Sequence, residues 1–156
     1  MTPDMHLNTW LRRLLTLTVL AGSCAFAAHA QNMVSVRSPT VNMRASPSTN
    51  SEVTWKLSRG YPLLILQKRD QWLEVQDFEG DRGWVARRVT SPKPHHIVKV
   101  KTANLRKGPG THYPIVGKAV YGEVLRTVRH KGQWVAVRAP QGKNLAWVAN
   151  HLVWGW

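Results

Sequence analysis

From residue 33 onward, the chain is a series of short segments in which apolar and polar residues alternate, separated by Gly, Pro, Ser and Asn. A period of two is typical of β-strands with one buried face, and the separating residues are typical of turns. The expected strands are 34–36, 41–44, 52–57, 63–67, 72–76, 83–86, 97–100, 103–106, 115–119, 123–128, 134–138 and 145–149, with turns at 77–81 and 139–142. No segment after residue 31 shows a helical apolar period, so the sequence predicts an all-β protein.

The second half of the chain repeats the first at an offset of about 62 residues. Residues 42–47 (NMRASP) align with residues 104–109 (NLRKGP). After one inserted residue, residues 84–86 (WVA) align with residues 147–149 (WVA). A fixed period of this length indicates one small supersecondary unit made twice.

The first 30 residues have the pattern of a secretory signal peptide. Arg12 and Arg13 precede an apolar run, and small residues flank His29 at a cleavage site that we place before Gln31. This predicts a periplasmic or secreted protein. Two alternatives stay open, an uncleaved anchor and a lipoprotein attached through Cys24.

These features divide the chain into four parts. A signal peptide (1–30) is followed by the first module (31–90), a Pro-rich linker (91–96) and the second module (97–156). Two prolines stiffen the linker and remove backbone donors, so we expect no central strand in it. The apolar residues at 152–156 are expected to dock onto a module.

Four motifs make the modules similar to a known family. They are Asn-x-Arg-x-x-Pro at residues 42 and 104, a Gly before an apolar strand, Trp-x-x-Val at residues 72 and 134, and Gly-Trp-Val at residues 83–85. With them, the chain resembles the bacterial SH3-like (SH3b) family, in the tandem form of secreted proteobacterial proteins. The resemblance implies two tandem small SH3-like β-barrels that recognise peptidoglycan, its peptide stems or an envelope protein.

The charge of the chain is uneven. The whole sequence has a formal net charge of +14. Residues 31–92 hold 9 Lys and Arg against 6 Asp and Glu, whereas residues 93–156 hold 11 against 1. We therefore expect the second module to attract anionic polymers or to make electrostatic contact with an anionic membrane surface. Charge alone does not decide between these ligands.

Arginine and aromatic residues are the candidates for ligand contact. Arg44 and Arg106 stand where a strand enters a loop, opposite to the core-facing Met43 and Leu105. Each could hydrogen-bond the carbonyl groups of its loop, or grip a ligand carboxylate. His112 and Tyr113 follow the Gly-Pro-Gly loop of the second module, and loops of small barrels often carry function. The remaining candidates are Trp72, Trp84, Trp134 and Trp147, which could either fill or cap the core or line a groove.

The loop sequences distinguish the two modules. Gly108 and Gly110 are interpreted as residues that need a positive φ beside Pro109. Ser46 and Ser48 replace them in the first module. We therefore expect binding through the second module.

No catalytic, metal or cofactor site is predicted. The acidic residues cluster near a predicted hairpin of the first module, where carboxylates are usually solvated and lack the separated pKa values of a catalytic pair. The adjacent His95 and His96 should point to opposite sides of an extended segment and so should not share one ion. A cofactor is not expected either.

Three functions remain open. The first is a non-enzymatic module that binds peptidoglycan or its anionic stem peptides. The second is a regulatory or interaction partner of an envelope protein such as a cell-wall hydrolase. The third, a nucleic-acid binder, is disfavoured by the predicted signal peptide, so we expect no specific nucleic-acid partner. A monomer is assumed.

Overall fold

The computed structural model describes residues 32–138 and 144–156. The predicted signal peptide (1–30) and the predicted turn at 139–142 lie outside the described residues. Within the described residues, no helix is long and apolar enough to cross a membrane.

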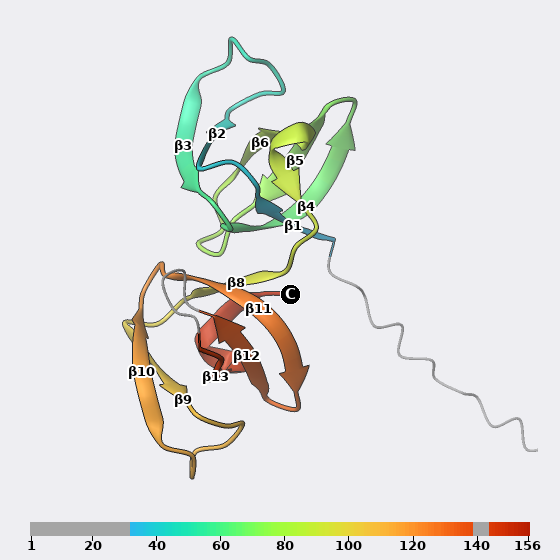
Figure 1. The fold of residues 1–156 in the computed structure, drawn as a ribbon. Helices are drawn as coiled ribbons and strands as arrows, with labels where there is room; N and C mark the ends of the chain where they lie inside the picture. Colours follow the sequence, from blue (N-terminus) through green and yellow to red (C-terminus); the bar gives the residue numbers. More distant parts are fainter. Residues whose placement is uncertain (1–31, 139–143) are drawn as a thin grey trace, which may run out of the picture.

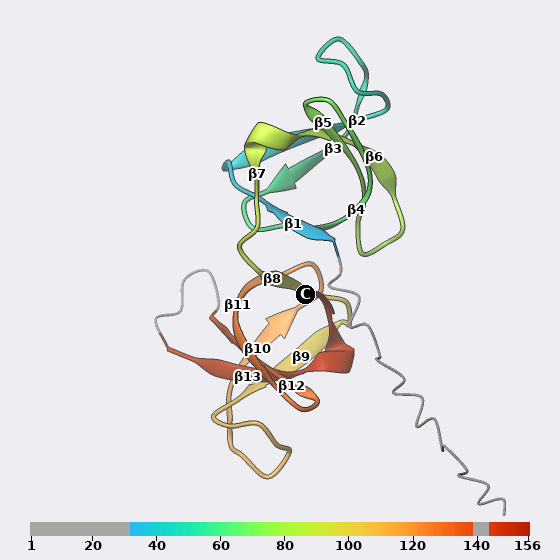
Figure 2. The same cartoon turned by 90° about the vertical axis from the view of Figure 1, so that its right-hand side faces the viewer.

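The first half of the described chain forms one antiparallel sheet that curls into a small barrel, which we call barrel one (Figures 1 and 2). Its order is β3-β2-β6-β5-β4-β1-β7. The strands are β1 (Met33–Val36), β2 (Thr40–Arg44), β3 (Val53–Ser58), β4 (Pro62–Arg69), β5 (Trp72–Gln76), β6 (Arg82–Ala86) and β7 (Thr90–Ser91). A short 3-10 turn, η1 (Arg87–Val89), joins β6 to β7.

The second half forms barrel two with the same topology. Its order is β10-β9-β13-β12-β11-β8-β14, which is the order of barrel one advanced by seven strands. The strands are β8 (His95–Val98), β9 (Thr102–Arg106), β10 (Ile115–Val120), β11 (Val124–Lys131), β12 (Trp134–Arg138), β13 (Ala146–Ala149) and β14 (Val153–Gly155), with η2 (Asn150–Leu152) before β14. The predicted all-β fold of two tandem barrels is confirmed.

Small and medium-sized apolar side chains fill each barrel. Met43 and Leu105 face the two cores, as strand alternation predicts, and Val75 and Val137 are fully buried. The core of barrel one is Val36, Val41, Met43, Leu57, Leu63, Leu73, Val75 and Val85. The core of barrel two is Val98, Ala103, Leu105, Ala119, Leu125, Val135, Val137, Ala146, Val148 and Val153. Most members occupy equivalent places in the repeat, so the same inward pattern specifies both barrels.

The segment predicted as a linker is shorter in the structure. Ser91 belongs to β7, and His95 and His96 begin β8, so Pro92–Pro94 are the residues between strands. β8 pairs antiparallel with both β11 and β14, and the two histidines belong to these pairings. The expected docking of residues 152–156 is seen as β14.

The two barrels lie against each other (Figures 1 and 2). The Phe78 ring packs between Tyr61, at 6.1 Å, and Tyr121 of barrel two, at 5.4 Å. The Tyr121 hydroxyl donates a hydrogen bond to Glu79. Gly60 has a φ of +82°, and a Cβ at this position would lie 2.9 Å from the His95 ring. A glycine therefore suits both the turn and the close approach of barrel two.

Candidate functional site

The loop between β9 and β10 is shaped by Arg106. The guanidinium Nη1 donates hydrogen bonds of 2.8 Å to the carbonyl oxygens of both Thr111 and Tyr113. Arg106, at the end of β9, thus holds the far side of the loop in place through these two hydrogen bonds. Of the two roles considered for this arginine, loop shaping is observed, and contact with a ligand stays a prediction.

The reason for the two glycines in this loop differs from the expected one. Neither Gly108 nor Gly110 has a positive φ. Instead, a Cβ at Gly108 would lie 2.5 Å from the Tyr113 ring, and a Cβ at Gly110 would lie 2.6 Å from the His112 ring. The expectation of a positive φ was wrong, because the glycines make room for two aromatic rings that pack at 4.2 Å from each other. His112 and Tyr113 are both exposed.

The loop between β2 and β3 of barrel one is held in a similar way without glycines. The Nη1 of Arg44 donates a 2.6 Å hydrogen bond to the carbonyl oxygen of Ser51. The Ser51 hydroxyl in turn accepts a 2.9 Å hydrogen bond from the backbone N–H of Ser46. Serine side chains therefore replace the aromatic packing that fills the loop of barrel two.

None of the four candidate tryptophans belongs to the two clusters of side chains that fill the barrels. Trp72, Trp84 and Trp134 are half-buried, and Trp147 is 5% exposed. Trp72 and Trp134 precede the inward-facing Leu73 and Val135, so their rings occupy the outer face of the sheet. Mainly aliphatic residues fill the two cores, so none of the four rings fills a core, and Trp147 is the one of the four that is buried.

In barrel two, four side chains form a row across the outer face of the sheet. Directly opposed residues in adjacent strands share a face, and the register pairs Arg106 with Trp147, Trp147 with Ala136, and Ala136 with Arg129. We call this set the outer row. The guanidinium carbon of Arg129 lies 5.2 Å from the centre of the Trp147 ring, within reach of a cation–π interaction.

The equivalent outer row of barrel one has a different chemistry. Its members are Arg44, Trp84, Glu74 and Gln67, paired in the same register. The Arg and Trp positions are kept, whereas Ala136 and Arg129 are replaced by an acid and an amide. Barrel two therefore presents two cations where barrel one presents one cation and one carboxylate.

Barrel one has a hollow beside Trp72. A space of about 180 Å³ is lined by Arg44, Thr49, Trp72 and Arg88 among others, and a second hollow of about 180 Å³ adjoins the same tryptophan. The structure thus brings Arg44 and Trp72, two of the candidates for ligand contact, to the same hollow. This hollow lies in the module whose loop departs from the family motif.

The histidines of β8 point to opposite sides of the strand, as expected. His96 is buried and is joined by a 2.6 Å hydrogen bond between its Nδ1 and the Thr127 hydroxyl. Burial and then the neighbouring His130, whose ring centre lies 5.4 Å away, lower the pKa of His96 to about 4. The imidazole is therefore neutral near pH 7 and serves as a buried polar group.

Three carboxylates gather in the β5–β6 hairpin, a grouping that the sequence did not resolve into a site. Oxygen atoms of Asp77, Glu79 and Asp81 lie within 4.8 Å of one another. Asp77 Oδ1, however, accepts hydrogen bonds of 3.0 and 2.9 Å from the backbone N–H groups of Glu79 and Asp81. Burial and then the charge of Asp77 raise the pKa of Tyr61, whose hydroxyl lies beside Asp77 Oδ2. The cluster accordingly stabilises the turn.

Comparison with known proteins gives one family match for each barrel. Residues 37–92 and residues 101–153 each match a family described as "Bacterial SH3 domain". The chain is 29% identical over 131 residues to "Putative N-acetylmuramoyl-L-alanine amidase YrvJ" of Bacillus subtilis (strain 168), which covers 73% of this chain and 25% of the relative. It is 36% identical over 53 residues to "Probable cell wall amidase LytH" of Staphylococcus epidermidis, which covers 34% of this chain and 18% of the relative.

The chain thus spans a quarter or less of the length of these two relatives. Among solved structures, an NlpC/P60 family protein from Bacillus cereus ATCC 10987 is similar with a TM-score of 0.37 and 13% identity, over 80% of this chain and 56% of that chain. The two family matches coincide with the two barrels and carry the assignment. The chain belongs to the bacterial SH3 domain family, of which it contains two copies in tandem.

Proposed function

We propose that this protein is a non-enzymatic binding module of the bacterial cell envelope, periplasmic or secreted, that recognises the anionic stem peptides of peptidoglycan through barrel two. The bacterial SH3 domains and the relatives named as cell wall amidases support a cell-wall-related module. The finer statement, which ligand and which barrel, rests on the outer row.

The difference between the two outer rows carries the proposal. An acidic peptide that approaches barrel one meets Glu74, whereas the same approach to barrel two meets Arg129. Arg129 is exposed, and its guanidinium is already held against the Trp147 ring. Binding therefore costs less side-chain conformational entropy than it would for a free arginine. An arginine held in this way can form two parallel hydrogen bonds to one carboxylate.

The loop of barrel two extends the same surface. Arg106 belongs to the outer row and also holds the loop that presents His112 and Tyr113. Tyr113 is 37% exposed and offers an aromatic face with a polar tip. Trp147, in contrast, is almost fully buried, so its part is to support Arg129. The proposed contacts are therefore Arg129, Tyr113 and the half-buried Trp134.

Co-sedimentation with purified peptidoglycan sacculi tests the proposal. Arg129→Gln introduces the residue that barrel one has at the equivalent place, and Tyr113→Ser does the same for the loop. Each should lower the bound fraction several-fold, because a charge-assisted hydrogen bond or an aromatic contact is lost. The control is Lys101→Gln, which removes an exposed cation of barrel two outside the outer row.

Two results would count against recognition by the outer row. The first is an equal loss of binding in Arg129→Gln and Lys101→Gln, which would mean attraction by net charge alone. The second is an equal supernatant fraction with and without sacculi. Recovery of one stoichiometric envelope protein in place of peptidoglycan fragments would favour the alternative, a regulatory partner acting in trans on a cell-wall hydrolase.

A further inference from the structure

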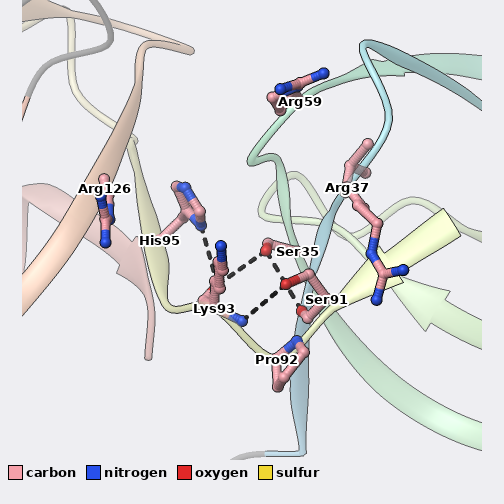
Figure 3. A pocket seen from close by; sticks show the side chains of 9 residues that line it. Ser35, Arg37, Arg59, Ser91, Pro92, Lys93, His95 and Arg126 are labelled. Atoms are coloured by element: carbon pink, nitrogen blue, oxygen red, sulfur yellow. Dashed lines mark hydrogen bonds between the residues drawn. The ribbon is translucent and has the colours of Figure 1, made fainter.

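A cleft of about 510 Å³ lies where the two barrels meet, and no sequence pattern pointed to it. Its walls come from three parts of the chain (Figure 3). Arg37 and Arg59 belong to barrel one, Lys93 lies between the barrels, and His95 and Arg126 belong to barrel two. The cleft therefore exists only when both barrels are in place.

The residues that line this cleft have one sign of charge. Four of them are Lys or Arg, and no carboxylate is among the described residues that line it. All four cations are exposed, so their charged ends are accessible to a ligand from solvent. Like charges around one space repel each other, and a bound anion would remove that repulsion.

The floor of the cleft is held by hydrogen bonds (Figure 3). The hydroxyl of buried Ser35 donates a 2.8 Å hydrogen bond to the carbonyl oxygen of Lys93. The backbone N–H of Lys93 donates to the Ser91 hydroxyl at 3.2 Å, and His95 Nδ1 lies 3.0 Å from the Lys93 carbonyl oxygen. These bonds connect the first barrel to the start of the second, so the cationic walls keep their spacing.

We propose that this cleft binds an anion that carries two linked phosphoryl groups and bridges the two barrels. The proposal concerns a surface separate from the outer row and does not depend on the proposed function. Near neutral pH the terminal phosphoryl group of such an anion carries about −1.5 to −2, and the linked group adds at least one further negative charge, so the pair offsets most of the charge of four cations. A carboxylate brings one charge, and a ligand would need several carboxylates at close range to match the cleft.

The type of cation agrees with this ligand. Three of the four are arginines, whose planar guanidinium matches the geometry of phosphate oxygens, and Lys93 adds a flexible point charge. Because the four side chains are exposed, binding should weaken as salt is added.

His95 offers a local signal for occupancy of the cleft. Burial lowers the pKa of His95, the hydrogen bond to the Lys93 carbonyl opposes this, and the charges of Arg126 and Lys93 lower the pKa further. A bound anion would oppose both cations. It should therefore raise the pKa of His95 and make protonation of the ring easier.

The test is a titration of the full chain with inorganic pyrophosphate, followed by calorimetry and by the NMR signal of the His95 ring. We expect saturable one-to-one binding, a shift of the His95 signal and a higher titration midpoint of that ring. Arg126→Gln and Arg59→Gln, one on each barrel, should each weaken binding by about 10-fold or more, as expected for loss of a charged hydrogen bond. The control Lys101→Gln should change affinity by less than about 2-fold, as expected for an exposed charge that does not line the cleft.

Citrate, whose carboxylates are ionised at pH 7, distinguishes phosphate recognition from attraction of any multivalent anion. Weaker binding of citrate than of pyrophosphate at the same salt concentration is the expected result. Equal affinity for citrate would overturn the assignment of phosphoryl groups. Binding that leaves the His95 signal unchanged, or that Lys101→Gln weakens as much as Arg126→Gln, would overturn the assignment of the cleft. Neither result would bear on binding to sacculi.

Discussion

At the scale of single residues, the packing of the barrel two loop requires two positions without a side chain. Gly108 and Gly110 lack a Cβ where the rings of Tyr113 and His112 pack, and a positive φ plays no part. The loop sequence shows that the glycines are present but does not show why they are needed. The reason is the packing of rings from residues later in the same loop, which depends on the folded conformation of the loop. This explains how the glycines could be found from the sequence while their role could not.

Gly108→Ala should displace the Tyr113 ring and loosen the loop. The added Cβ would lie 2.5 Å from that ring, so the ring or the loop must move, at a cost of about 1 kcal/mol or more in the free energy of unfolding. Urea denaturation gives the free energy, and NMR shifts of the loop residues report the displacement.

The control for this change is another glycine of the same barrel. At Gly117 in β10, a Cβ would meet Leu105 at an ordinary distance of 3.8 Å. Gly117→Ala should leave the stability within about 0.5 kcal/mol or raise it slightly. Equal effects of the two substitutions would show that steric contact with Tyr113 is not what requires Gly108.

At the scale of elements, the alternation of apolar and polar residues located the main strands, and the repeat paired each with its counterpart. The short strand β7 and the start of β8 could not be predicted, because Pro92 and Pro94 flank them and the partners that hold them are far away in sequence. The outer faces were harder to predict than the inner ones. A tryptophan at the start of a strand fits either face until the neighbours that fill the core are known.

One difference between strands β8 and β11 and their counterparts β1 and β4 is a buried polar pair. His96 and Thr127 stand where barrel one has Val34 and Ile65. The pKa of His96 in the folded protein, about 4, lies below its ordinary value of 6.5, so the unfolded chain binds more protons between these two values. The stability that neutral His96 contributes is complete above pH 6.5 and falls as the pH decreases towards 4.

Barrel two should therefore lose up to about 3 kcal/mol of stability between pH 7 and pH 4 through this residue. Urea denaturation followed by NMR signals assigned to each barrel measures the effect, with barrel one as an internal comparison. The double variant His96→Val with Thr127→Ile introduces the apolar pair of barrel one and should remove most of this dependence. An unchanged pH profile in the double variant would mean that other groups cause it.

At the scale of the whole molecule, contact between the barrels was not predictable from the repeat. The Tyr61, Phe78 and Tyr121 rings meet across the boundary, and Tyr121 stands where barrel one has Arg59. A repeat predicts what the copies share, whereas an interface between copies depends on residues in which they differ. For the same reason, the cationic cleft could not be predicted from the sequence.

Tyr121→Ala should uncouple the two barrels without unfolding either one. It removes the packing on Phe78 and the hydrogen bond to Glu79, whereas the barrel cores stay intact. Small-angle scattering should show a larger radius of gyration, and NMR relaxation should show more independent tumbling.

Val120→Ala is the matched control, since Val120 is 56% exposed and immediately precedes Tyr121. It should leave both quantities unchanged. If Tyr121→Ala gives the scattering and relaxation of the unmodified chain, the aromatic contact does not determine how the barrels are held.

The pairing of the first strand of each barrel with its last strand imposes an order in time. β1 pairs with β7, where Ser35 lies opposite Ser91, and β8 pairs with β14. Pairings between distant residues close slowly, in milliseconds to seconds for all-β domains. During synthesis from the N-terminal side, barrel one can close once residue 91 is available, but barrel two must wait for residue 155. The boundary between the barrels is thus the last part of the molecule to form, and a partially synthesised chain already contains one finished barrel.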